Sequence, residues 1–449
     1  MGDATVVAHG RLIDGTGADP IPSSAVVVEG GRIVRVGKTG DFQYPDDATV
    51  VNLTGRWIVP GFMDLHAHMN HHGQVMAPER QAEVAETLVG FGITTIRSTA
   101  EPHGSGINIR GRIASGKIVG PRMFTADRIL DLAGGFLDQL DLPIVTSVGN
   151  AEDVRAEANR QVQAGADFVK LYCQLSPNLV RAGIEACHQL GVRAIGHLGA
   201  TNWTQAARLG INTLTHSGPI GPAAELVPAE QQEHFRDFYM PGPNFDPGLF
   251  DDWLELVDLD GPEFRTLLEA LKDGEVEVNP DLVILEVLYW VDEPEYLERV
   301  MEPQYANPEH AEVWRNSPWL VSTGWSPDQL AAAKASLPVV LEMTRRFHEA
   351  GILLTAGSDL GNSWVTPGVS LHRELELLHR AGIPAIEVLT IATRNGAEAL
   401  GILDDVGTVE PGKRSDLVVL TADPVADIRN TRSIEAVYLG ERRILPAHP

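Results

Sequence analysis

The pattern of apolar and polar positions divides the chain into two ends rich in short strands and a long middle part. In residues 4–58, short apolar runs alternate with turns, and one hairpin is expected around Gly30-Gly31. Similar apolar runs return at Asp416 to Leu420 and at Ile434 to Leu439. Because such short strands cannot bury two faces alone, we expect both ends to build one composite β-sandwich, from residues 1–59 and 405–449.

In the middle part, the pattern changes to helices that end at a glycine and lead into a buried strand. The helix expected at Ala151 to Gly165, for example, leads into a strand at Asp167 to Tyr172. Repeated units of this kind predict an α/β fold, specifically a (β/α)8 TIM-type barrel over residues 60–404 with an aromatic-rich insertion at about 219–326. The other strands are expected at residues 62–65, 92–98, 122–126, 192–197, 211–216, 276–284 and 352–359.

Polar residues with metal-binding chemistry follow these strands. His66 and His68 come after the strand Phe62 to Leu65, and residues two apart in extended backbone point the same way. Active sites of such barrels are built at the carboxyl ends of the strands, so we expect one shared centre. The further candidates at these strand ends are Lys170, His197, His216 and Asp359.

The segments that carry these residues form an ordered series. They are Gly61-Phe62-Met63-Asp64-Leu65-His66-Ala67-His68, Phe168-Val169-Lys170-Leu171-Tyr172, Gly196-His197-Leu198-Gly199, Thr215-His216, Ala356-Gly357-Ser358-Asp359, Leu371 to Leu378 and Gly407 to Leu420. Together they resemble the amidohydrolase superfamily, metal-dependent hydrolases on a barrel flanked by a β-sandwich. Within it, the chain looks most like the branch of imidazolonepropionase-related amidases and Xaa-Pro or Xaa-Arg/Lys dipeptidases.

The resemblance implies two divalent metal ions, with Zn²⁺ as the expected ion, and a small-molecule substrate. A water shared by the ions would attack an amide, peptide or cyclic amide C–N bond, and Asp359 would pass its proton to the leaving amine. A protonated lysine between two ions would be repelled, whereas a carbamate on Lys170 would be a bidentate oxygen ligand. The implied ligands are His66, His68 and Asp359 for one ion, His197 and His216 for the other, and Lys170 as the bridge.

Lys170 favours the binuclear alternative, because relatives with one metal generally lack a bridging residue on this strand. The other functions left open are a mononuclear deaminase or cyclic-amide hydrolase and a binuclear esterase, lactonase or phosphotriesterase. A third possibility is a non-enzymatic scaffold protein, like the related dihydropyrimidinase-like scaffold proteins that have lost metal ligands. The intact ligand set argues against this possibility.

Tyr172 and His372 are further candidates for substrate contact. Tyr172 lies two residues past Lys170 and so on the same side of the strand, where it could reach the pocket or pack as an aromatic residue at the rim. His372 lies in a His-Arg-Glu-Leu stretch where relatives place polar residues near the site, or it caps the following helix. His71 and His72, on the loop after His68, could touch substrate, but loop histidines near a ligand run more often face solvent, so we do not include them among the site residues.

The insertion at about 219–326 could form a lid over a partly apolar or aromatic substrate, since aromatic side chains supply large contact areas. A small local core or an oligomer interface are the alternatives. The aromatic residues concerned are Trp253, Trp290, Trp314, Trp319, Trp325, Phe235, Phe238, Tyr239, Phe245, Phe250 and Tyr289.

Charge and composition narrow the setting. The chain has 61 acidic and 35 basic residues, a formal net charge of -26, which repels nucleic acid and anionic membranes. It has two cysteines and no apolar stretch of about 18 residues. We therefore expect a cytoplasmic enzyme, and relatives often assemble into homo-oligomers.

Overall fold

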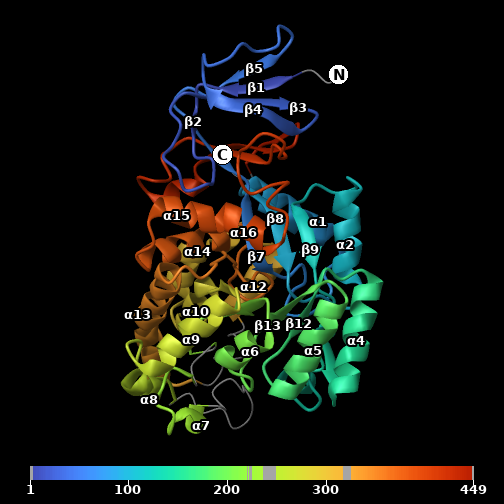
Figure 1. Ribbon diagram of the computed structural model, residues 1–449, viewed down its shortest axis with the longest axis vertical. Helices are drawn as coiled ribbons and strands as arrows, with labels where there is room; N and C mark the ends of the chain where they lie inside the picture. Colours follow the sequence, from blue (N-terminus) through green and yellow to red (C-terminus); the bar gives the residue numbers. More distant parts are fainter. Residues whose placement is uncertain (1–3, 220, 222–224, 236–248, 317–324, 447–449) are drawn as a thin grey trace.

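The computed structural model describes residues 4–219, 221, 225–235, 249–316 and 325–446 (Figure 1). Its strands form four sheets, two from the chain ends and two parallel sheets from the middle part. Figure 1 places the terminal sheets at the upper end of the molecule and the parallel strands below them, with helices outside. Within the described residues, no helix has both the length and the apolar character needed to cross a membrane.

The strands of the chain ends are β1 Thr5–Ala8, β2 Arg11–Leu12, β3 Ser24–Glu29, β4 Arg32–Lys38, β5 Thr49–Asn52, β6 Trp57–Pro60, β16 Leu417–Leu420, β17 Ile434–Leu439 and β18 Arg442–Ile444. One sheet has the order β4-β3-β1-β5 and the other β18-β17-β16-β6-β2, so the second mixes strands from both ends. In it, β6 pairs antiparallel with β16. An apolar cluster shared by the two sheets includes Val7 and Val26 from the first and Ile58 and Val419 from the second.

The middle strands are β7 Phe62–Ala67, β8 Ile93–Ser98, β9 Arg122–Thr125, β10 Ile129–Leu132, β11 Val145–Val148, β12 Phe168–Leu171, β13 Arg193–Gly196, β14 Thr213–Thr215 and β15 Glu277–Asn279. They form the parallel sheets β7-β8-β9 and β11-β10-β12-β13-β14-β15. Backbone hydrogen bonds run from Asp167 N to Thr125 O (2.9 Å), from Thr355 N to Val278 O (3.1 Å) and from Leu65 N to Ala356 O (2.8 Å). The segment around Thr355 therefore lies between β15 and β7.

Side-chain caps mark the starts of some helices. α4 begins after Asn150, whose side chain accepts from Glu152 N and Asp153 N, and it ends at Gly165, which has a φ of 106°. α13 begins with a capping box between Ser326 and Gln329. The helices are α1 Pro78–Gly90, α2 Ser105–Ala114, α3 Phe136–Gln139, α4 Ala151–Ala164, α5 Pro177–Gln189, α6 Trp203–Leu209, α7 Gln232–Phe235, α8 Leu249–Leu256, α9 Pro262–Asp273, α10 Leu282–Tyr289, α11 Pro294–Met301, α12 Pro308–Asn316, α13 Pro327–Glu349, α14 Val369–Arg380, α15 Ala385–Thr390 and α16 Gly396–Ala399, with short turns at Pro303–Tyr305, Ile391–Asn395 and Ile428–Arg432.

Two expected strands are shorter than the apolar pattern suggested. The strand expected at 276–284 ends at Asn279, because Pro280 has no N–H for a ladder and Asp281 takes a left-handed φ of 53° before α10 begins. The strand expected at 352–359 makes only isolated bridges, at Leu354 and Leu360.

The aromatic residues of the insertion pack mainly inward. Four of them are buried in the main apolar cluster: Phe235, Phe250, Trp253 and Tyr289. Burial of these side chains is expected for a local core but not for the surface of a lid. Phe238, Tyr239, Phe245 and Trp319 lie outside the described residues.

Candidate metal centre

The six ligands expected from the sequence lie together at the carboxyl ends of the parallel strands. His66 is in β7 and Lys170 in β12, while His197 and His216 directly follow β13 and β14. Ring centroids are 5.5 Å apart for His66 and His68, 4.6 Å for His66 and His216, and 4.3 Å for His197 and His216. The four imidazoles thus form one continuous cluster.

Three ligand atoms converge at one side of this cluster. His68 Nε2 lies 3.0 Å and His66 Nε2 3.5 Å from Asp359 Oδ1. The three residues can each offer an atom within 4.8 Å of the others. Burial, and next the Lys170 charge, hold the pKa of His66 well below its ordinary value. A neutral His66 keeps the lone pair that a metal ion requires.

Asp281 is a member of the cluster that sequence reasoning missed. Its Oδ2 lies 2.6 Å from His66 Nδ1 and 3.3 Å from His216 Nδ1, although the second contact lacks hydrogen-bond geometry. The sequence did hold a signal, since Pro280-Asp281 follows directly after the strand Glu277–Asn279, at the same kind of position as the other candidates. The longer strand expected at 276–284 hid it by placing Asp281 mid-strand.

Lys170 is buried close enough to His66 and His216 for its charge to act on both. Its Nζ donates to Thr215 Oγ1 over 3.0 Å. Burial lowers the pKa of Lys170 to about 8, although the carboxylates of Asp281 and Asp359 act to raise it. Its amine is therefore more easily deprotonated than that of an exposed lysine.

The segment that carries Asp359 is tied directly to β7. Ser358 donates from its N (3.0 Å) and its Oγ (2.6 Å) to the Asp64 carboxylate, and Asp359 N donates to His66 O over 2.7 Å. Gly357 permits this approach, because a Cβ there would lie 2.6 Å from His66 Cβ. These contacts fix Asp359 beside the two histidines.

Several residues of the cluster adopt a left-handed backbone. The φ angles are 68° at His216, 53° at Asp281 and 58° at Asp359. Such angles are uncommon outside glycine and cluster at functional sites, where the surrounding structure holds them.

The two substrate-contact candidates have different positions. The Tyr172 ring packs edge-on against His197 with centroids 4.8 Å apart, next to the cluster. The His372 nitrogens instead bind Phe91 O and Thr431 Oγ1, both over 2.9 Å, and the side chain packs against Phe62. The structure therefore does not bring His372 to the centre. Its side chain points from α14 toward Phe62 of β7 and toward the short turn Ile428–Arg432.

His71 does not face open solvent as the sequence suggested. It is half-buried and stacks on His310, with ring centroids 3.7 Å apart. His72 is also half-buried, with its Nε2 3.0 Å from Ser363 Oγ. The partners of these histidines come from distant segments, which a local sequence pattern cannot reveal.

Comparison with known families now adds to this geometry. The sequence model of the amidohydrolase family matches residues 57–228 and 289–441. The chain belongs to the amidohydrolase family. The matched residues of this amidohydrolase include all six expected ligands, whereas Asp281 falls in the gap between the two matched ranges.

Individual relatives agree with that placement. A dihydroorotase of Mycobacterium tuberculosis is 26% identical over 207 residues, covering 45% of this chain and 43% of the dihydroorotase. An imidazolonepropionase of Porphyromonas gingivalis is 42% identical over 77 residues, covering 17% and 18%. The matches thus span less than half the length of these curated relatives. The crystal structure of a Xaa-Pro dipeptidase with bound methionine in the active site matches with a TM-score of 0.71 and 20% identity, over 99% of this chain and 100% of that one, so the two share a fold.

Proposed function

We propose that this amidohydrolase is a metal-dependent hydrolase that cleaves an amide, peptide or cyclic amide C–N bond of a small molecule. The observation that carries this proposal is the convergence of four imidazoles with Asp359 and Lys170 in a buried cluster. Its matches to a dihydroorotase and an imidazolonepropionase add support.

The donor set fits a pair of divalent ions, with Zn²⁺ preferred by its nitrogen and oxygen atoms. Burial holds the pKa values of His66 and His216 well below the ordinary value, so both imidazoles are neutral donors. Bound ions would polarise the substrate carbonyl and lower the pKa of water. One ion would be held by His66, His68 and Asp359 and the other by His197 and His216, with Lys170 between them as a carbamate.

Asp281 has a separate role in this proposal. His66, His216 and Asp281 also lie close enough together to hold an ion. We assign Asp281 to orienting His66, because the 2.6 Å contact occupies His66 Nδ1 and leaves Nε2 facing Asp359. Histidine ligands commonly donate their second N–H to such a carboxylate.

Asp359 is the residue placed to move a proton. Its carboxylate lies among the ligand atoms, so it can accept a proton from the attacking water and deliver it to the leaving nitrogen. Tyr172, beside His197, would contact the substrate.

The proposal includes the architecture that positions these groups. The two parallel sheets and the segment around Thr355 would form one closed (β/α)8 barrel over residues 60–404, which the backbone bonds across both gaps support. Residues 1–59 and 405–449 would form a composite β-sandwich beside it, supported by their shared apolar cluster.

The first experiment measures bound metal in protein produced with zinc and bicarbonate. We expect two ions per chain, and in Lys170→Ala one or none, with hydrolysis lower by roughly a hundredfold or more. Lys170→Glu is the matched control, because it keeps an oxygen ligand at this position and should retain more metal than alanine. Two ions persisting in Lys170→Ala would contradict the bridge.

The second experiment screens N-acyl amino acids, dipeptides, arylamides, lactones and phosphotriesters with that metal-loaded protein. Cleavage of amides is expected. Turnover of lactones or phosphotriesters without any amide would contradict the proposed bond class.

A further inference from the structure

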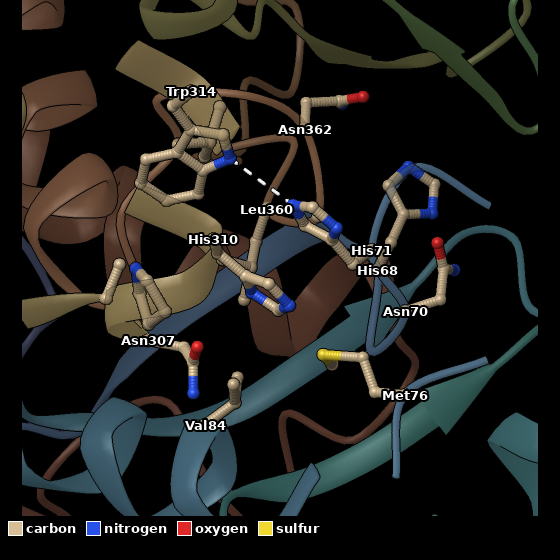
Figure 2. A pocket seen from close by; sticks show the side chains of 14 residues that line it. His68, Asn70, His71, Met76, Val84, Asn307, His310, Trp314, Leu360 and Asn362 are labelled. Atoms are coloured by element: carbon tan, nitrogen blue, oxygen red, sulfur yellow. Dashed lines mark hydrogen bonds between the residues drawn. The ribbon is translucent and has the colours of Figure 1, made fainter. Parts of the chain in front are cut away.

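A pocket opens beside His68, at the edge of the candidate metal centre (Figure 2). His68 forms part of one wall, and Leu360 and Asn362, which follow Asp359 in the chain, form another. His310 and Trp314 reach the pocket from α12. A group bound here would therefore lie next to the proposed reaction site.

Flat aromatic faces form one side of the pocket. The His71 and His310 rings stack with centroids 3.7 Å apart and only 3° between their planes. Trp314 Nε1 donates to His71 Nε2 over 3.3 Å, as Figure 2 shows. His71 must be neutral to accept this hydrogen bond, and two charged imidazoles would repel each other in such a stack. Burial also lowers the pKa of His71 to about 3.

The pocket lacks charged side chains. None of the 14 described residues that line it is an aspartate, glutamate, lysine or arginine. The apolar residues Met76, Val84 and Val365 complete the lining. A charged group entering here would lose water without gaining a counter-charge.

We propose that this pocket is a specificity subsite for an uncharged aromatic group of the substrate. The inference rests on the proposed function and adds a substrate class to it. A planar ring can stack on the faces of His310 and Trp314, and it carries no charge to be desolvated. The scissile bond would then lie on the side of His68 and Asp359.

The test uses zinc-loaded full-length chain and dipeptides in which each position in turn is Phe, Leu, Lys or Glu. At one position, kcat/KM for Phe should exceed that for Lys and Glu by roughly tenfold or more, with Leu between. Val84→Glu adds a carboxylate to the wall and should shift preference toward Lys. Val313→Glu is the matched control, because Val313 lies on α12 but is 46% exposed and outside the pocket.

A second measurement separates the subsite from the hydrolytic function. Titration calorimetry with benzyl alcohol and benzylamine measures binding and needs no bond cleavage. Only the uncharged benzyl alcohol should bind. Its binding should be weaker in His310→Ala than in the control variant Trp290→Ala, which changes an aromatic residue outside the pocket. This selectivity without cleavage of any amide, peptide or cyclic amide would refute the proposed function and uphold the subsite. Equal cleavage of Phe and Lys dipeptides, or equal binding of both probes, would overturn the subsite.

Discussion

His372 shows how burial fixes the charge of a single residue. Its side chain is 1% exposed, and both ring nitrogens already have partners in Phe91 and Thr431. Burial lowers the pKa of His372 from 6.5 to about 3, so the folded protein keeps it neutral. His372 therefore has a packing role on α14 and is not placed to contact a substrate.

A pH-dependent stability follows from that pKa. Between about pH 6.5 and pH 3 the unfolded chain binds a proton at His372 that the folded chain does not, so the free energy of unfolding falls as the pH is lowered. The slope from this residue is about 1.4 kcal/mol per pH unit. Denaturant unfolding at pH 7.5 and 5.5 should show a smaller acid-induced loss in His372→Gln than in the natural chain. Parallel losses in both proteins would contradict this.

Asp281 offers a second prediction at the residue scale. If it orients His66, then Asp281→Asn should weaken metal binding by roughly ten- to a hundredfold, as removal of such partners does elsewhere. Equilibrium dialysis against a competing chelator measures this directly. Asp404→Asn, which changes an exposed carboxylate outside the cluster, is the matched control. Unchanged affinity in Asp281→Asn would argue against the orienting role.

At the scale of elements, one buried ion pair links strands across the interior. Arg97 of β8 binds Glu277 of β15 through two bonds of 2.8 Å, and its Nε donates to Leu65 O over 2.7 Å. Thr213 and Thr355 also donate to Glu277, each over 2.6 Å. The pair thus connects β7, β8, β14, β15 and the Thr355 segment beneath the candidate metal centre.

Breaking one side of this pair should be costly. Arg97→Met would leave the Glu277 carboxylate buried without its partner and should lower the free energy of unfolding by about 3–5 kcal/mol. The double variant Arg97→Met with Glu277→Leu should recover much of that loss. The exposed pair Arg429–Asp427 is the control, and Arg429→Met should change stability little. Denaturant midpoints report all of these effects.

The sequence could predict the elements better than the contacts between them. The rule that strand ends carry chemistry pointed to His66, His68, Lys170 and the later members of the cluster, because each lies in or directly after a clear apolar run. It missed Asp281, where the apolar run continues past the strand into α10. His71 and His310 are separated by more than half the length of the chain, and only tertiary packing brings their rings together. The local spacing of residues in the sequence therefore cannot predict this stack.

At the scale of the whole molecule, one large apolar cluster connects the elements that carry the candidate centre. The main cluster extends from Phe62 of β7 to Val437 of β17, and so joins the parallel strands to a terminal sheet. Cys173 and Cys187 are both free and buried within the protein. Rigid support of this kind is what a site with several left-handed residues requires.

The pairing of β6 with β16 has a consequence for the order of folding. On the ribosome, Trp57–Pro60 emerges before its partner Leu417–Leu420, which follows only after the whole intervening stretch 61–416 has been made. Until then, the β6 edge has open backbone groups, the kind of surface that invites association with other nascent chains. The pairing of this sheet therefore cannot close until residues 417–420 have been made.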